Sequence, residues 1–143
     1  MANNVTPLSD REERLLGALA HGSVIGQGIG ILVGVVLYVT QRDRSRRVAF
    51  QALQAAVYQF VGLLLTLGLW LVWGIVHGIS YIPLFQNPEA FEDAPPPLFI
   101  ISLVGMAVPL AVMVLWGLYG LWGALQTLRG RDFRYPVIGR LVG

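Results

Sequence analysis

Two histidines are the residues of this sequence whose chemistry would most directly serve a cofactor. His21 and His77 each lie near one end of a long uncharged stretch. Neutral imidazole ligates metals, so two histidines at similar depth on neighbouring helices would suit a haem, and one alone a chlorophyll-type magnesium. Both positions also fall near the expected water interface, where a histidine can simply reach water or lipid headgroups. His21 and His77 are therefore candidate cofactor-binding residues, while no particular cofactor and no metal site is predicted.

No catalytic constellation is visible elsewhere in the sequence. The eight acidic residues all lie outside the long uncharged runs, and no serine or threonine has a base placed to activate it. The chain has no cysteine, which excludes disulfides, thiolate metal sites and S-acylation. We therefore expect a protein that is not an enzyme.

The distribution of charge predicts the fold class. All ten arginines and eight acidic residues fall in four short clusters, at 10–14, 42–47, 89–93 and 129–140. A helix of about 20 apolar residues crosses a bilayer core of about 30 Å, and each uncharged run between the clusters is longer than that. Backbone amides are not left unpaired in hydrocarbon, so such runs form helices. The sequence predicts an all-α integral membrane helical bundle, with residues 1–143 in a single membrane domain.

The sign of each cluster predicts the orientation in the membrane. Clusters 42–47 and 129–140 each hold four arginines and one aspartate, whereas 89–93 is purely acidic. Positive flanks stay in the cytoplasm, so loop 42–47 and the C-terminus are expected inside a bacterial cytoplasmic (inner) membrane and loop 80–97 outside it. We predict three transmembrane helices, listed here with their bounds: 23–40, 48–79 and 98–128. The N-terminus would then be external, unless the segment before the first span folds back.

A short helix is expected before the first span. Ser9 followed three residues later by Glu12 is a capping-box pattern, which predicts an interfacial helix over 10–21, either amphipathic or re-entrant. The glycine-dense stretch 22–30 is expected to bend or break it. In the third span, the ring of Pro109 would clash with the carbonyl four residues earlier, so a kink is expected there.

Glycine lines one face of the first expected span. A helix with small residues every four positions packs closely in lipid, either against a partner or against the protein's own helices. The predicted helix-packing residues are Gly22, Gly26, Gly30 and Gly34.

A second candidate surface combines the start of the second span with the C-terminal tail. Both are expected on the inner side of the membrane, where they form what we call the cytoplasmic cap. Its residues are Arg46, Arg47, Phe50, Gln51, Gln54, Tyr58, Arg134, Tyr135, Pro136 and Arg140. Three of them, Gln51, Gln54 and Tyr58, make one polar stripe. Each basic residue near the surface attracts anionic lipid by about 1 kcal/mol. The cap would contact lipid headgroups, a partner's acidic loop or a passing polypeptide, or would only anchor the topology.

Three segments carry a family resemblance: ERLLGALAH at 13–21, RVAFQALQAAVYQ at 47–59 and FRYPVIGRL at 133–141. Together, over about residues 12–141, they resemble the Tic-twenty-like family, a bacterial domain of unknown function related to a small helical subunit of the chloroplast inner-envelope protein translocon. The resemblance implies a helical membrane protein and a role in protein translocation or insertion. The plant subunit is similar to a four-helix protein, whereas the charge pattern here predicts three crossings.

The sequence favours a non-catalytic accessory or structural subunit of a larger membrane protein complex. The alternatives are a translocation or insertion component, from the resemblance, and a haem- or pigment-binding bundle, from the two histidines. The expected partners are a lipid bilayer with anionic headgroups, other membrane protein subunits, or a second copy of the chain in a homo-oligomer. No nucleic-acid partner is expected.

Overall fold

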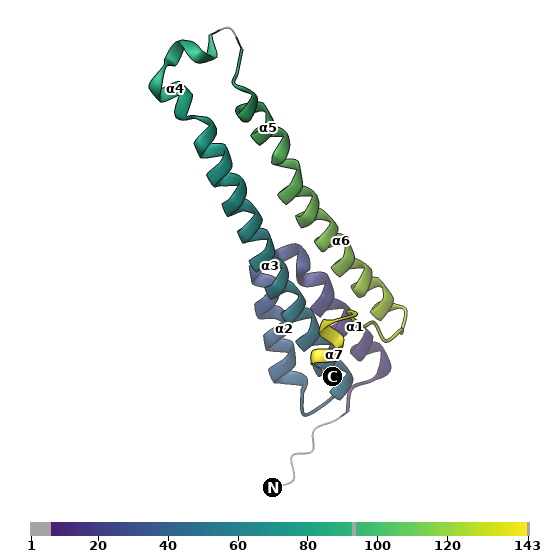
Figure 1. The fold of residues 1–143 in the computed structure, drawn as a ribbon. Helices are drawn as coiled ribbons and strands as arrows, with labels where there is room; N and C mark the ends of the chain where they lie inside the picture. Colours follow the sequence, from purple (N-terminus) through teal and green to yellow (C-terminus); the bar gives the residue numbers. More distant parts are fainter. Residues whose placement is uncertain (1–6, 93, 143) are drawn as a thin grey trace. The chain divides into compact units, whose positions relative to one another are not determined.

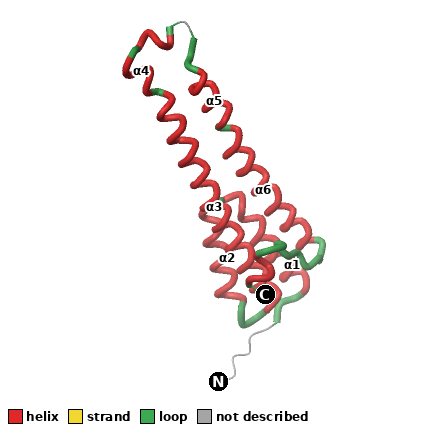
Figure 2. Tube along the Cα trace, viewed as in Figure 1, coloured by secondary structure: helices red, strands yellow, loops and turns green. Residues whose placement is uncertain are grey.

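The structure is a computed structural model that describes residues 7–92 and 94–142, so Asp93 of the acidic loop lies outside the described residues. In these ranges every regular element is helical, and loops occupy short connections (Figure 2). The elements in chain order are α1 (Asp10–Gly22), η1 (Ser23–Gly26), α2 (Gly28–Gln41), α3 (Arg46–Ser80), α4 (Ile82–Gln86), η2 (Pro88–Phe91), α5 (Pro97–Gly105), α6 (Ala107–Leu128) and α7 (Ile138–Leu141). The all-α prediction is confirmed.

The chain divides into two compact units. The first unit comprises Met1–Leu63 and Trp116–Gly143, and the second unit comprises Leu64–Leu115. The long helix α3 and the helix α6 each contribute one part to each unit. The prediction of a single membrane domain stays a prediction.

Helix α1 begins where the capping box predicts. The backbone N–H of Ser9 donates to Oε2 of Glu12 at 2.8 Å, and the Ser9 hydroxyl oxygen accepts from the Glu12 N–H at 3.4 Å. These bonds satisfy amides that the first turn of a helix leaves unpaired. The Ser9 backbone bond also holds the pKa of Glu12 below its usual value. The predicted helix start at Asp10 is confirmed.

A turn at Gln27 separates the glycine-rich region into two helices. Gln27 has φ 48° and ψ −120°, a conformation that residues with a side chain seldom adopt. The break falls inside the predicted stretch 22–30 but later than the expected start of the first span at residue 23. Helix α2 therefore has 14 residues, which at 1.5 Å per residue gives about 21 Å, short of a bilayer core of about 30 Å. The first predicted span is thus shorter than expected.

Helices α1 and α2 pack as an antiparallel hairpin in the first unit (Figure 1). The Ser45 hydroxyl, just after α2, donates to Oε1 of Glu13 at 2.5 Å. Nη1 of Arg47 lies 3.8 Å from Oε2 of the same glutamate. The start of α1 therefore lies beside loop 42–47, as in the alternative in which the N-terminal segment folds back.

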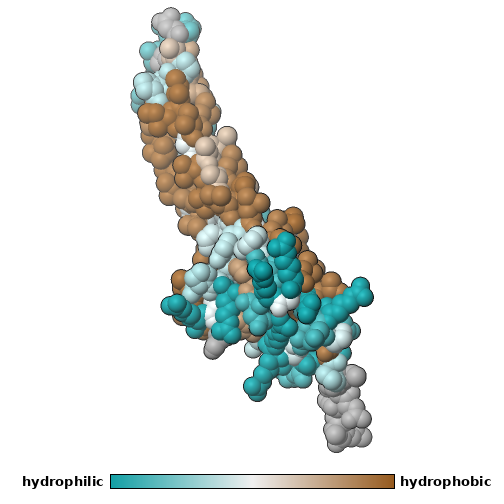
Figure 3. Space-filling model, turned by 90° about the vertical axis from the view of Figure 1, so that its right-hand side faces the viewer, coloured by the Kyte–Doolittle hydropathy of each residue, from teal (hydrophilic) through white to brown (hydrophobic). Residues whose placement is uncertain are grey.

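Within residues 7–92 and 94–142, two helical stretches are long and apolar enough to cross a membrane. They are Arg46–Gln86, which includes α3 and α4, and Pro97–Leu128, which includes α5 and α6. Only 6% and 11% of their most apolar windows are buried, whereas a core helix of a soluble protein is mostly buried. In the view of Figure 3, apolar residues cover most of the surface of the second unit. By length and composition these are two candidate membrane spans, and among the described residues the third predicted span is present only as the shorter apolar helix Gly28–Gln41.

The expected distortion at Pro109 is present. Helix α5 ends at Gly105 and α6 begins at Ala107, with a turn at Met106 between them. Proline has no N–H to donate to the carbonyl of Gly105, and its ring crowds that carbonyl, so the regular hydrogen-bond ladder is interrupted there.

Candidate functional site

Four polar side chains of the first unit form a buried network, which we call the polar network: His21, Gln51, Gln54 and Tyr135. Nε2 of His21 lies 2.7 Å from Oε1 of Gln51, and Nδ1 lies 3.1 Å from the Tyr135 hydroxyl. Burial raises the pKa of Tyr135, so its hydroxyl is protonated and available as a donor. The consistent assignment has Tyr135 donating to Nδ1 and the Nε2–H of His21 donating to Gln51.

Gln54 clamps the C-terminal segment onto α3. Its Nε2 donates to Oε1 of Gln51 at 2.6 Å and to the carbonyl of Phe133 at 2.8 Å. Its Oε1 accepts from the backbone N–H of Tyr135 at 3.3 Å. One amide thus satisfies two backbone groups of a segment that has no regular secondary structure. The polar stripe predicted from the spacing exists, but it is buried against α1 and the C-terminal segment.

An aromatic stack holds the same segment from the side. The ring of Tyr58 lies between those of Tyr135 and Trp116, at centroid distances of 3.9 and 4.6 Å and nearly parallel to both. The Tyr58 hydroxyl donates to the carbonyl of Trp116 at 2.6 Å. Stacking and burial of these large rings add to the hydrogen bonds of Gln54. The residues Trp116 and Phe133, which sequence analysis did not select, belong to this packing.

Arg47 of the cytoplasmic cap forms ion pairs with acidic side chains of the protein itself. Its guanidinium lies 2.9 Å from Oδ1 of Asp132 and 3.8 Å from Oε2 of Glu13, and it donates to the carbonyl of Gly130 at 3.2 Å. It therefore joins α1, α3 and the segment after α6. Arg46 is exposed, and the guanidinium of Arg134 lies 4.9 Å from the centroid of the Phe50 ring.

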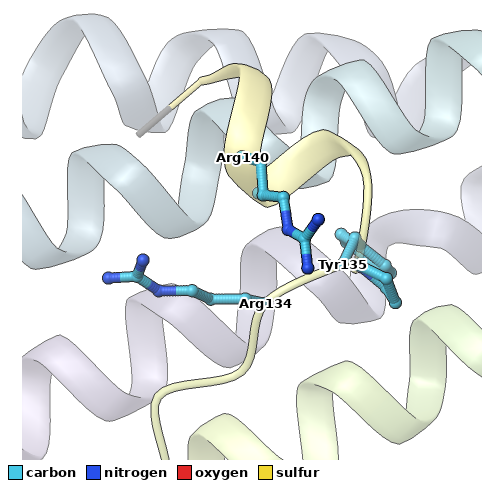
Figure 4. Close-up of a pocket in the computed structure, with 5 residues that line it drawn as sticks. Arg134, Tyr135 and Arg140 are labelled. Atoms are coloured by element: carbon cyan, nitrogen blue, oxygen red, sulfur yellow. The ribbon is translucent and has the colours of Figure 1, made fainter.

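The remaining cap residues line a hollow of about 460 Å³ beside α7 (Figure 4). Its lining residues are Arg134, Tyr135, Pro136, Gly139 and Arg140. Four of these were predicted cap residues, and Gly139 was missed. A side chain at Gly139 would place Cβ 3.1 Å from Cβ of Arg134 and 3.3 Å from Oε1 of Gln54. In the sequence, Gly139 is a small residue between the larger Ile138 and Arg140, and this contrast could have identified it as a position of close packing.

The four predicted packing glycines do not share one helix face, because the break at Gln27 falls between the second and the third. Gly34 packs on α3, where an added Cβ would lie 2.9 Å from Cβ of Ala56. Gly30 faces Gln59 and the carbonyl of Ser23. Gly22 faces Ala124, and Gly26 meets Ile29 across the turn at Gln27. Gly30 and Gly34 thus pack against the chain's own helices.

His77 belongs to a separate cluster in the second unit. Its Nδ1 lies 2.8 Å from the Ser102 hydroxyl, and its ring stacks on Trp73 at 4.8 Å. The Trp73 indole N–H donates to the Ser102 carbonyl at 2.8 Å. These contacts link α3 to α5.

Each histidine is hydrogen-bonded to other side chains of the same protein. Both ring nitrogens of His21 are hydrogen-bonded, so ligation of a cofactor there would require one of those bonds to be exchanged. In residues 7–92 and 94–142, no group of three or more His, Asp and Glu side chains is placed to hold a metal ion. Cofactor binding by His21 or His77 stays a prediction.

A comparison with known protein families shows to which family the chain is related. Residues 12–142 match the magnetosome magnetite crystal formation protein family (MamF/MmsF). The chain belongs to this family. The match includes every helix of the structure except the first residues of α1. No curated protein and no solved structure matches the chain.

The resemblance to the Tic-twenty-like family is therefore wrong, since the family that matches over nearly the whole chain is MamF/MmsF. The segments that suggested it are short. In the structure their residues, such as Gln51, Gln54 and Tyr135, serve internal packing. The expectation of a translocation role rested on that resemblance and falls with it.

Proposed function

We propose that this chain is a small non-catalytic membrane protein that takes part in magnetite crystal formation in the magnetosome membrane. The observation that carries the proposal is the family match over residues 12–142, which includes the polar network and both apolar helical stretches. The two apolar stretches support a location in a bacterial membrane.

An accessory role is supported by the polar side chains of the first unit, which are hydrogen-bonded within the chain itself. His21, Gln51 and Gln54 are buried and hydrogen-bonded to one another or to the C-terminal segment. Tyr58 donates to a backbone carbonyl. These groups position the chain's own elements, which favours a protein that acts through its shape and surfaces, with other membrane subunits or further copies of itself as partners.

The topology that we propose has two full crossings and one re-entrant hairpin. The apolar stretches Arg46–Gln86 and Pro97–Leu128 cross the membrane, and the α1–α2 hairpin enters it and returns. Three crossings would need α2 to span alone, and its length of about 21 Å argues against that. Arginine in loop 42–47 and in the tail places both in the cytoplasm, with Glu89 and Glu92 on the opposite side.

Deletion of the gene from the bacterium that encodes it tests the proposed function. We expect magnetite crystals whose size or shape differs from the wild type in electron micrographs, because a component of crystal formation is missing. Complementation with the wild-type gene is expected to restore them, and so is the Gly74→Ala variant, whose added methyl group enters open space. Crystals of unchanged number, size and shape in the deletion strain would refute the proposal.

A further inference from the structure

The hollow beside α7 holds two arginines whose charge the protein leaves uncompensated. Within residues 7–92 and 94–142, neither Arg134 nor Arg140 takes part in an ion pair. The five residues that line the hollow include no acidic side chain. The nearest acidic residue in sequence, Asp132, is paired with Arg47 at 2.9 Å. An anion that enters the hollow therefore meets two cations and no opposing carboxylate among the residues that line it.

The two arginines that line the hollow come from different elements, Arg140 from α7 and Arg134 from the segment before it. Arg140 extends from α7 back toward the backbone at Tyr135, and Arg134 extends from that backbone in another direction (Figure 4). Both side chains are exposed, so an anion can reach them. Arg134 lies over the Phe50 ring at 4.9 Å, a contact that stacks the guanidinium while leaving its edge N–H groups to donate.

The backbone around the hollow is held in place by the polar network. Gln54 bonds the residues on both sides of Arg134, through the carbonyl of Phe133 at 2.8 Å and the N–H of Tyr135 at 3.3 Å. Gly139 allows α7 to approach closely, because a Cβ there would lie 3.1 Å from Cβ of Arg134. A site whose backbone is fixed before binding loses less conformational freedom on association.

We propose that Arg134 and Arg140 form a binding site for a phosphate group. A guanidinium presents a planar fork of N–H donors that matches two oxygens of a phosphate, and this geometry makes arginine the preferred side chain for such groups. The volume of about 460 Å³ leaves room for the substituent of a phosphate ester as well as for free phosphate. Two sources have this chemistry: an anionic lipid headgroup at the membrane surface and inorganic phosphate in solution.

Titration calorimetry of the purified full-length protein in a neutral detergent tests the site. The probes are inorganic phosphate and short-chain phosphatidylglycerol, each titrated into wild type and into the double variant Arg134→Gln/Arg140→Gln. We expect the double variant to lose roughly tenfold or more in affinity, since hydrogen bonds to charged groups are lost. Arg140→Gln alone is expected to lose less. Because both side chains are exposed, the variants should elute from a sizing column like wild type.

The control variant Arg11→Gln/Arg129→Gln removes the same charge from two exposed arginines that do not line the hollow. It is expected to bind both probes as wild type does. Loss of phosphatidylglycerol binding alone would identify the source as a lipid headgroup, loss of phosphate binding alone as the free ion, and loss of both as a site open to either. Binding that is equal in wild type and the Arg134/Arg140 variant would overturn the proposal. Equal losses in the control variant would overturn it too, because they would show diffuse attraction to positive charge.

Discussion

Replacement of Gln54 by leucine is expected to release the C-terminal segment from α3. The amide satisfies the Phe133 carbonyl and the Tyr135 N–H, and leucine has a similar volume but no polar atom. A buried backbone group without a partner costs about 1–3 kcal/mol. The loss of both bonds should therefore lower the free energy of unfolding by roughly 2–6 kcal/mol.

Two measurements on the purified protein check this result. Thermal unfolding in a mild detergent should show a lower midpoint, and trypsin should cleave faster after Arg134 and Arg140 in the Gln54→Leu variant. Gln86→Leu is the matched control, because Gln86 is exposed in α4 and the same substitution there removes no buried partner. Cleavage and melting of Gln54→Leu that match those of wild type would show that the clamp does not hold the segment.

Replacement of Gly34 by valine is expected to force α2 away from α3. An added Cβ would lie 2.9 Å from Cβ of Ala56 and 3.1 Å from the carbonyl oxygen of Ala52, both on a helix that has little room to move. Overpacking of a close contact costs about 1–3 kcal/mol and sometimes more. The branched side chain of valine adds further atoms at the same point, so we expect an effect at the upper end of that range.

Unfolding in the same detergent measures the effect of Gly34→Val against Gly74→Val. Gly74 lies in α3 with nothing within 4 Å of its added Cβ, so valine there should leave the midpoint close to that of wild type. Equal midpoints for the two variants would mean that α2 does not pack on α3 at Gly34.

The elements that local chemistry defines were predictable from the sequence. The Ser9 and Glu12 pair set the start of α1, and the lack of a backbone N–H at Pro109 set the interruption between α5 and α6. The sign of the charge clusters required one helix in 48–79, and α3 is one helix. A bend or break was expected within 22–30, but its position at Gln27 was not, because hydropathy is continuous across it and no proline marks it. Its consequence, a helix too short to cross alone, was therefore missed.

The sequence predicted which residues belong to the candidate site, but not whether their side chains face the protein interior or its surroundings. Spacing placed Gln51 and Gln54 on one helix face, yet a face of glutamines suits water, headgroups or a protein interior alike. Only the approach of His21 and the Phe133–Tyr135 backbone shows that this face is internal. Counting charge along the chain likewise treats all arginines as equivalent. The structure separates Arg47, which is paired internally, from the arginines of the hollow.

In the proposed topology, the N-terminus, loop 42–47 and the C-terminal tail lie on one side of the membrane. Because the chain has no cysteine, single-cysteine variants report each position without background. The four variants are Pro7→Cys, Asp43→Cys, Leu141→Cys and Asn87→Cys, and an impermeant maleimide is added to intact spheroplasts of an expression host. We expect labelling of Asn87→Cys alone, with the other three labelled only after the membrane is permeabilised. Labelling of Pro7→Cys in intact spheroplasts would contradict this topology, because α2 would then have to cross the membrane and the α1–α2 hairpin would not be re-entrant.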